Sequence, residues 1–434
     1  MDPSPIRNHY PLYRILPRKT AGRIFPRLKE APTDGNHCPR WQADGCGIAP
    51  GSAVGAVDAN RGCRLYVLDN LLPDGVETRR RIADRVKAEG LEPFHLLAKI
   101  GRDCVGALQF LPADVPPPSP GQVDVDAIDD GRICAILRSL NRVPLGLSDD
   151  DGFRLSIAGA QNKTALTLVE GQWCLPLGST ATTHILKPAI GVLGNGWDFS
   201  RSVENEWFCL GFLRRFGLAT PDADIRRFDG ETALVVERFD RRWTQDGRLL
   251  RVPQEDLLQA IGLPRTQKYE VDGGPTLAEV MAVLRASDHP DEDCAALFKA
   301  KILYWLLAAT DCHAKNASLF IRPQGGFRLC PFYDVVSVQP NLDAGQVDDG
   351  LARMAVSVNG RARVEDIGHD DWLAEARRCG TSPAAVTDII RSIVADAPMA
   401  AEAQLAALPT GFPEDLAASI IGGFLRRLKV IMAA

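Results

Sequence analysis

The chain has no long apolar run, no strong excess of charge and no paired cysteine motif. No stretch approaches the roughly 18–20 apolar residues that a membrane-spanning helix needs. Residues 1–18 are basic but lack the apolar centre of a secretory signal. The net charge of −5 does not point to nucleic acid as the main ligand. We therefore expect a cytoplasmic protein with no membrane partner.

The cysteines argue against a disulfide framework and against a zinc module. They number eleven, are scattered and form no CxxC pair, so most are predicted to be small buried apolar side chains. The cluster of His37, Cys38, Cys46 and Cys63 could be interpreted as a set of zinc ligands, but its spacing fits no common zinc site. A zinc site is therefore the weaker interpretation of that cluster.

The chain does have enough apolar material for at least two lobes. Its 434 residues exceed the size at which one core stops growing, and 45% hydrophobic residues exclude a disordered chain. Strand-like patterns dominate the first half and helical patterns the second, which predicts an α+β fold. The predicted segments are residues 1–60 with little periodicity, 61–120 ending in a proline-rich linker, 121–250 with strands, and 251–434 mainly helical.

The periodicity also predicts individual elements. Strands are expected at 105–111, 153–157, 165–169, 183–187, 233–238, 318–321 and 327–331. Helices are expected at 79–89, 94–98, 124–141, 203–216, 253–261, 276–285 and 294–309. Residues 189–200 contain Gly191, Gly194 and Gly196 and are predicted to form a mobile loop.

One polar run has the spacing that phosphoryl transfer needs. Asp311-Cys-His-Ala-Lys-Asn316 lies between an apolar helix and an apolar strand, and Asp334 follows the next hairpin. In kinases an Asp orients the acceptor hydroxyl, while an Asn five residues later and a second Asp hold Mg²⁺. Alternatively, Asp311 could cap a helix and Asn316 could make a turn. Four polar side chains in apolar surroundings favour a functional site, because burying an unpaired charge is costly.

A lysine and a glutamate complete the expected phosphate site. Lys187 ends the predicted strand 183–187 and could grip phosphates, although it could also be a solvated surface charge. The following helix carries Glu204 and Glu206. We expect Glu206 to pair with Lys187, because its neighbours Trp207 and Leu210 should face the core.

Two further stretches are candidates for nucleotide contacts. The small-residue turn between strands lacks the P-loop spacing, but its backbone N–H groups could cradle phosphate. Its residues are Ala158, Gly159, Ala160, Gln161, Asn162, Lys163 and Thr164. Glu237, Arg238 and Phe239 end a strand just where the chain turns helical, at the place of an adenine hinge. An edge strand with surface charges fits that pattern equally well.

In these stretches the chain resembles the HipA family of toxin kinases. The matching motifs occur in the family's order from about residue 65 to the end. They include Leu68-Asp-Asn-Leu-Leu-Pro-Asp74, Arg154-Leu-Ser-Ile-Ala-Gly-Ala160, Lys268-Tyr-Glu-Val-Asp-Gly-Gly-Pro275, Asp311-Cys-His-Ala-Lys-Asn316 and Pro331-Phe-Tyr-Asp334. Residues 1–60 do not resemble the family's N-terminal β subdomain, and Cys312 stands where relatives often have Gly.

The resemblance implies a two-lobed protein-kinase-like fold with ATP between the lobes. Asp311 is then the catalytic base, with Asn316 and Lys187 as further catalytic residues, and Asn316 and Asp334 bind Mg²⁺. His313 and Lys315 belong to the nucleotide site with the turn and the hinge. Ser156 matches the family's autophosphorylated serine, whose phosphorylation is expected to expel the phosphate loop.

The resemblance also implies partners. These are a HipB-type helix-turn-helix antitoxin dimer, DNA mainly through that antitoxin, and a translation-related protein substrate such as glutamyl-tRNA synthetase. Two alternatives remain. One is a small-molecule phosphotransferase, which has a similar Asp-x₄-Asn loop, and the other is a catalytically inactive corepressor that binds the antitoxin. Lys187, Asp311, Asn316 and Asp334 are all present, which favours an active protein kinase.

Overall fold

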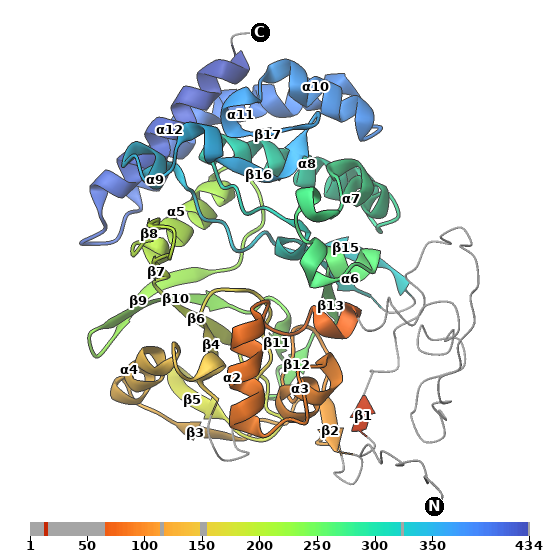
Figure 1. Cartoon of the computed structure of the whole chain (residues 1–434), viewed down its shortest axis with the longest axis vertical. Coiled ribbons are helices and arrows are strands. Elements are labelled where there is room, and N and C mark those ends of the chain that lie inside the picture. The colour runs from red at the N-terminus through yellow and green to blue at the C-terminus, as the bar shows by residue number, and fades with distance from the viewer. Residues whose placement is uncertain (1–12, 16–65, 113–116, 148–153, 323–324, 433–434) are drawn as a thin grey trace, which may run out of the picture.

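The computed structural model describes residues 13–15, 66–112, 117–147, 154–322 and 325–432. They form two lobes, a sheet-containing N-lobe and a mainly helical C-lobe, and the chain crosses from one to the other near residue 252 (Figure 1). The predicted α+β fold is thereby confirmed. No helix of the described ranges is both long enough and apolar enough to cross a membrane.

A six-stranded antiparallel sheet is the centre of the N-lobe. The strand order is β3-β5-β4-β6-β10-β9. The strands are β3 Val125–Ala127, β4 Thr164–Val169, β5 Gln172–Pro176, β6 His184–Pro188, β9 Ala223–Phe228 and β10 Glu231–Glu237. In the β6–β10 pair, Lys187 lies opposite Leu234 and His184 lies opposite Glu237. This register places the predicted phosphate lysine on a central strand, three residues along β6 from the position opposite Glu237 of the predicted hinge.

Helices cover the two faces of this sheet because its strands alternate. Ala233 and Val235 of β10 pack on one face with α4 (Asp130–Ser139), which Asp129 caps through Arg132 N. Leu234 and Val236 point to the other face and contact Val203 of α5 (Ser202–Arg215). The far side of α5 belongs to the large C-lobe core. This one helix therefore joins the sheet to the C-lobe (Figure 1).

Residues 66–112 form a smaller helical unit against the sheet. It contains α2 (Val76–Val86), α3 (Pro93–Ile100) and the short strand β2 (Phe110–Pro112), which pairs with β1 (Tyr13–Ile15). The apolar sides of α2 and α3 are buried with residues of the sheet. The unit thereby holds the segment before β4 in place.

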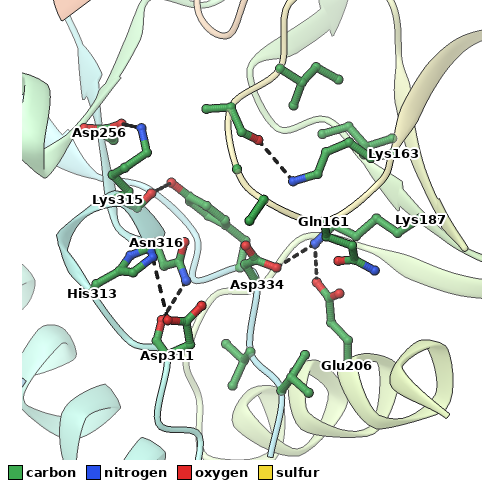
Figure 2. Close-up of a pocket in the computed structure, with 18 of the residues that line it drawn as sticks. Gln161, Lys163, Lys187, Glu206, Asp256, Asp311, His313, Lys315, Asn316 and Asp334 are labelled. Atoms are coloured by element: carbon green, nitrogen blue, oxygen red, sulfur yellow. Dashed lines mark hydrogen bonds and ion pairs between the residues drawn. The ribbon is translucent and has the colours of Figure 1, made fainter. Parts of the chain in front are cut away.

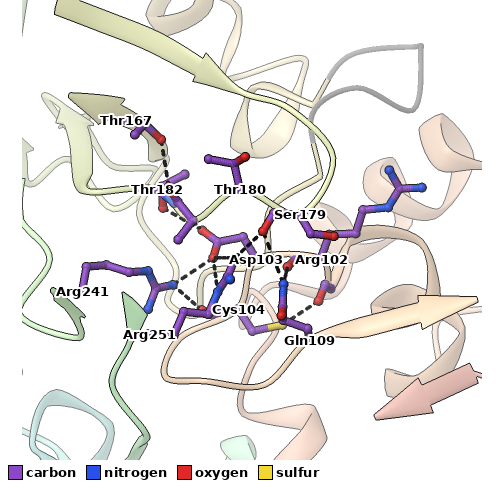
Figure 3. Close-up of polar contacts among 12 residues, drawn as sticks. Arg102, Asp103, Cys104, Gln109, Thr167, Ser179, Thr180, Thr182, Arg241 and Arg251 are labelled. Atoms are coloured by element: carbon purple, nitrogen blue, oxygen red, sulfur yellow. Dashed lines mark hydrogen bonds and ion pairs between the residues drawn. The ribbon is translucent and has the colours of Figure 1, made fainter. Parts of the chain in front are cut away.

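A network of buried charges fastens this unit to the strands beyond the hinge. The Asp103 carboxylate accepts hydrogen bonds from Arg241 and Arg251 at 2.8–3.0 Å and from Thr182 (Figure 3). It also accepts one from Arg238 at 3.4 Å. Burial alone would raise the pKa of Asp103, but the three arginines hold it well below its usual range. Two short strands, β11 (Arg241–Trp243) and β12 (Leu249–Arg251), carry two of these arginines.

The C-lobe is a helical core with short strands on its N-lobe side. Its helices are α6 Leu257–Ile261, α7 Leu277–Leu284, α8 Pro290–Leu307, α9 Gln339–Asp343, α10 His369–Arg378, α11 Pro383–Ala406 and α12 Glu414–Met432. Its strands are β13 Gln254–Asp256, β14 Ser318–Ile321, β15 Phe327–Leu329, β16 Arg353–Val358 and β17 Arg361–Arg363. The last six residues of α8, 302–307, are all apolar or aromatic and are all buried.

The structure corrects several boundaries that periodicity predicted. The strand expected at 105–111 is only β2 at its end, and residues 154–157 are not in a strand. The helices expected at 124–141 and 253–261 each begin with a short strand, β3 and β13. Sheet pairing overrides local helical pattern there, since β3 pairs with β5 and β13 with β14.

Two other expectations have different outcomes: residues 189–200 contain a hairpin, whereas the described cysteines are mostly buried, as expected. Residues 189–200 form a hairpin of β7 (Gly191–Val192) and β8 (Asp198–Phe199), which Asn341 contacts through Asp198 O. Of the described cysteines, all but the half-buried Cys294 are buried, and none is in a disulfide. His37, Cys38, Cys46 and Cys63 lie outside the described residues.

We expect Asp103→Asn to destabilise the protein by about 3–5 kcal/mol, because Arg251 loses its counter-charge while Arg238 and Arg241 are left to share the carboxylate of Asp240. Chemical denaturation at pH 7 measures this. The wild-type contribution is complete above the unfolded pKa of about 3.9 and declines only as the pH falls below it, since the folded pKa is depressed.

The matched control is Asp246→Asn, an exposed Asp that pairs with Arg248 at the β11–β12 turn. An equally small loss of unfolding free energy in both variants would contradict a stabilising role for the buried network.

Candidate active site

A cavity of about 540 Å³ lies between the lobes. The N-lobe contributes β6, the turn before β4 and the end of β10, and the C-lobe contributes the segments after α8 and after β15. Leu193, Trp197 and Phe199 of the β7–β8 hairpin line it as well. The cavity is therefore the cleft in which the resemblance predicts a nucleotide.

Lys187 joins the two lobes at the centre of this cavity (Figure 2). Its Nζ donates to Glu206 Oε1 at 2.7 Å and to Asp334 Oδ1 at 2.9 Å. Burial would lower the pKa of Lys187, but the two carboxylates outweigh it and raise the pKa above its ordinary value. Burial would likewise raise the pKa of Asp334, but Lys187 and Lys163 hold it well below its usual range. Lysine and aspartate are thus both charged, and Glu206 is the partner that the sequence predicted.

Asp334 is held in an unusual backbone conformation. Its φ is 60°, in the left-handed region that non-glycine residues rarely adopt. The preceding Tyr333 is fixed by hydrogen bonds of its hydroxyl with Ser318 and Lys315 O and by contact with the Phe239 ring. Such strain persists only where the surroundings impose it, and here it directs the carboxylate toward Lys187.

Asp311 lies at the opening of the cavity, with 62% of its side chain exposed. Its Oδ1 accepts a hydrogen bond from the Tyr269 hydroxyl at 2.8 Å, and its backbone oxygen accepts one from Asn316 Nδ2 at 2.8 Å. Partial removal of the Asp311 carboxyl from water raises its pKa, and the hydrogen bond from Tyr269 lowers it by a smaller amount. A carboxylate with a raised pKa suits a proton acceptor.

His313 is buried beside this carboxylate. Burial and the charge of Lys268 lower its pKa to about 3, so the ring is neutral near pH 7. Its Nε2 lies 3.8 Å from Asp311 Oδ1, and its ring meets the Tyr269 ring edge to face. His313 therefore forms a wall of the site and carries no charge.

The N-terminal unit reaches into the same cavity. Lys315 Nζ donates to Asn70 O and Oδ1 at 3.0 and 2.9 Å, and it pairs with Asp256 at 3.2 Å. Lys268 donates to Asp74 Oδ2 at 2.9 Å. These contacts fix the segments on either side of Asp311 against residues 66–112.

The turn before β4 passes over the cavity in a conformation that only glycine adopts easily. Gly159 has φ of 108°, and a Cβ there would lie 2.6 Å from Lys163 Nζ. Lys163 donates to Ala158 O at 3.0 Å, and the Gly159 oxygen accepts from Asp74 N. Burial lowers the pKa of Lys163. The turn thus presents a second lysine close to Lys187.

Ser156 stands behind this turn and is fully buried. Its hydroxyl donates to Leu71 O at 2.8 Å, and its backbone N–H donates to Asp103 O at 2.9 Å. A phosphate does not fit on this side chain unless the segment leaves its place.

Most of the predicted site residues line the one cavity. They are Ala158, Gly159, Ala160, Gln161, Lys163, Lys187, Glu237, Arg238, Phe239, Asp311, His313, Lys315, Asn316 and Asp334. Asn162 and Thr164 do not, because Asn162 bonds Asn141 outside and Thr164 bonds Leu145 O behind the turn. The guanidinium of Arg238 points into the Asp103 network and the ammonium of Lys315 toward Asn70. The predicted roles of both side chains in nucleotide binding thus gain no support from where they point.

Sequence reasoning gave no role to several residues that meet here: Asn70, Asp74, Asp256, Lys268 and Tyr269. The sequence could have pointed to these residues, since all of them fall within stretches that match the family. A role was not assignable because their partners lie far away along the chain.

The donor set fits a nucleotide with a hard divalent cation. Asp334 and the free amide oxygen of Asn316 offer the oxygen ligands that Mg²⁺ prefers. Lys187 and Lys163 supply positive charge for phosphates from the opposite side. The Phe239 ring, which contacts Phe320 and Tyr333, gives an apolar surface near the hinge.

The fold and the cleft define a protein of the kinase-like class. The structure of HipA in complex with HipB and operator DNA from Shewanella oneidensis has the same fold, with a TM-score of 0.72 at 22% identity over 86% of this chain and 87% of that chain. The HipA-like C-terminal domain family matches residues 155–401, and the HipA N-terminal domain family matches residues 40–111. The chain therefore belongs to the HipA family of kinase-like proteins.

Two relatives show how far the likeness extends. The predicted kinase Y4mE of Sinorhizobium fredii is 35% identical over 344 residues, which are 77% of each chain. The serine/threonine-protein kinase toxin HipA of Shewanella oneidensis is 26% identical over 318 residues, 70% of each chain. The N-terminal match starts at residue 40, which corrects the expectation that all of residues 1–60 depart from the family.

We expect Tyr269→Phe to raise the pKa of Asp311 further, because the lost hydrogen bond stabilises the carboxylate. A hydrogen bond to a charged group of about 1.5–3 kcal/mol corresponds to an increase of about 1–2 in pKa. A ¹³C-NMR titration of labelled aspartate measures it, with the signal assigned by its absence from Asp311→Asn.

Tyr304→Phe is the control, since Tyr304 lines the same cavity. An Asp311 pKa that stays the same in Tyr269→Phe would contradict the role given to this hydroxyl.

Proposed function

We propose that this protein is an ATP- and Mg²⁺-dependent serine/threonine protein kinase of the HipA toxin type. The observation that carries the proposal is the Lys187–Glu206–Asp334 group in the same cavity as Asp311 and Asn316. A lysine paired with a helix glutamate, a metal-binding aspartate and a catalytic-loop aspartate are the parts that phosphoryl transfer requires. An inactive binding module would have no need to keep them together.

Each group of the site has its own role in the proposed phosphoryl transfer. ATP supplies the γ-phosphoryl group, and Mg²⁺ neutralises charge on its phosphates. Lys187 and the turn at Gly159 hold the phosphates, and Asn316 and Asp334 offer the metal ligands. Asp311 accepts the proton of the acceptor hydroxyl while that oxygen bonds to the γ-phosphorus. The bond from this phosphorus to the β,γ-bridging oxygen breaks, and ADP leaves.

Ser156 is the proposed site of autophosphorylation and of self-inhibition. Its hydroxyl is buried against Leu71 O, so the segment must open before it can act as an acceptor. A phosphate adds roughly two negative charges at neutral pH. Those charges, placed three residues before Gly159, would keep the turn away from its position over the phosphates.

The proposed partners come from the relatives. A protein of the same fold, HipA of Shewanella oneidensis, is found with HipB and operator DNA, so we propose a HipB-type helix-turn-helix dimer as the antitoxin. DNA would be met mainly through that partner, in the cytoplasm. The proposed substrate is a translation-related protein such as glutamyl-tRNA synthetase.

The experiment compares the wild type with Asp311→Ala in the presence of labelled ATP and Mg²⁺. Removing a general base costs about 10²–10⁴-fold in rate, so label on Ser156 is expected in the wild type and almost none in the variant. Mass spectrometry locates the phosphate, and the protein is checked beforehand to be unmodified at Ser156.

Asp388→Ala is the control, because Asp388 is an exposed Asp on α11 that pairs only with Arg391 in the described structure. A folded wild type that incorporates no label into itself or into any protein would refute the kinase.

A further inference from the structure

A second cavity, of about 460 Å³, adjoins the nucleotide cleft. The two cavities share Tyr269, Thr310 and Asp311. Asp311 can therefore be approached from two sides. The cleft already described suits a nucleotide, so an acceptor that reaches Asp311 needs another approach, and the second cavity provides it.

The walls of this second cavity are fixed by hydrogen bonds. The floor is β16, whose Ala355 N–H donates to Thr310 O at 2.8 Å, one residue before Asp311. The opposite wall is the segment 269–271. Glu270 clamps it to β16, since its carboxylate accepts from Ser357 N at 2.5 Å and from Ser357 Oγ at 2.8 Å. The cavity thus keeps its shape without a ligand.

Apart from Asp311 and Thr310, the groups left for a ligand are apolar or positive. Val271, at the rim, is 91% exposed, and Met354, Ala355 and Ala362 line the interior. Arg353 is exposed and pairs with no acidic residue among those that the structure describes. The hydroxyl of Ser357 donates a hydrogen bond to the carboxylate of Glu270, so neither group is left for a ligand. A small polyhydroxylated ligand needs several converging polar groups, whereas the polar side chains of the lining that are left besides Asp311 are Thr310 and Arg353.

We propose that this second cavity is the acceptor groove for a polypeptide segment that presents a serine or threonine to Asp311. An acidic residue of the segment pairs with Arg353, and an apolar residue contacts Val271. Tyr269 holds Asp311 Oδ1 from the wall between the cavities, so the acceptor hydroxyl gives its proton to Oδ2. The proposal rests on the proposed kinase activity, whose phosphoryl transfer it leaves unchanged.

The test uses the full chain and two exposed rim positions. Arg353→Glu reverses the charge of the groove, and Val271→Lys adds a charge to its rim. The matched controls are Arg227→Glu on β9 and Val430→Lys on α12, which are exposed residues away from both cavities. The probe is a library of serine peptides with acidic, neutral or basic residues on each side of the serine.

The wild type should prefer acidic peptides, and Arg353→Glu should prefer basic ones. We expect KM for an acidic peptide to rise about tenfold in Arg353→Glu, which corresponds to about 1.4 kcal/mol. The reversal removes one exposed charge attraction and adds a repulsion. The inverted preference is a gain, which a misfolded variant cannot show. Val271→Lys should raise KM for every peptide with an apolar residue near the serine, and neither control should change preference.

A binding measurement distinguishes a failure of the groove proposal from a failure of the kinase proposal. Anisotropy of a fluorescent acidic serine peptide needs no turnover. Binding that depends on Arg353 in a protein without transfer activity refutes the kinase and keeps the groove. An active kinase whose peptide preference ignores both rim substitutions refutes the groove. So does transfer to small alcohols such as aminoglycosides with no transfer to any peptide.

Discussion

The hydrogen-bonded contact of Lys187 with Glu206 and Asp334 is the interaction on which the site depends. It ties a central strand of the sheet, the helix that bridges both lobes, and the segment after the β14–β15 hairpin. A buried lysine is stable as a cation only with such partners. The same three charges that hold the lobes together therefore also face the place where phosphate and metal would be bound.

The N-terminal unit completes this site instead of merely flanking it. Asn70 and Asp74 hold Lys315 and Lys268 on either side of Asp311. Asp103 gathers arginines from the hinge and from the strands after it, and its backbone oxygen accepts from Ser156 N. A displacement of residues 66–112 would thus disturb the contacts of Arg238, of the segment around Asp311 and of Ser156 together.

Asp311 lies where two cavities meet, and its neighbours give the two sides different characters. Toward the first cavity lie the lysines and carboxylates of the proposed nucleotide site. Toward β16 lie apolar side chains and Arg353, which pairs with no acidic residue among those that the structure describes. In the proposed mechanism, one carboxylate therefore serves a charged donor on one side and a polypeptide hydroxyl on the other. Tyr269 in the shared wall orients it for both.

The sequence by itself determined the class of the fold and pointed to most of the side chains that line the cleft. Three features could be recognised within short segments: the Asp-x₄-Asn spacing, the strand lysine and the later aspartate. In a short segment, the order of residues limits which atoms the side chains can reach. Glu206 was chosen over Glu204 from helical periodicity alone, and the contact with Lys187 bears this out.

Only the tertiary structure decided which remote residues join that set. The side chains of Asn162 and Thr164 lie outside the cleft, and Arg238 points into the Asp103 network. Asp74 and Lys268, which are 194 residues apart along the chain, meet at the site. These outcomes depend on long-range pairing and on the burial of charge. The local sequence pattern predicts neither the long-range pairing nor the burial of charge. Both depend on which distant groups can neutralise one another once the lobes have packed.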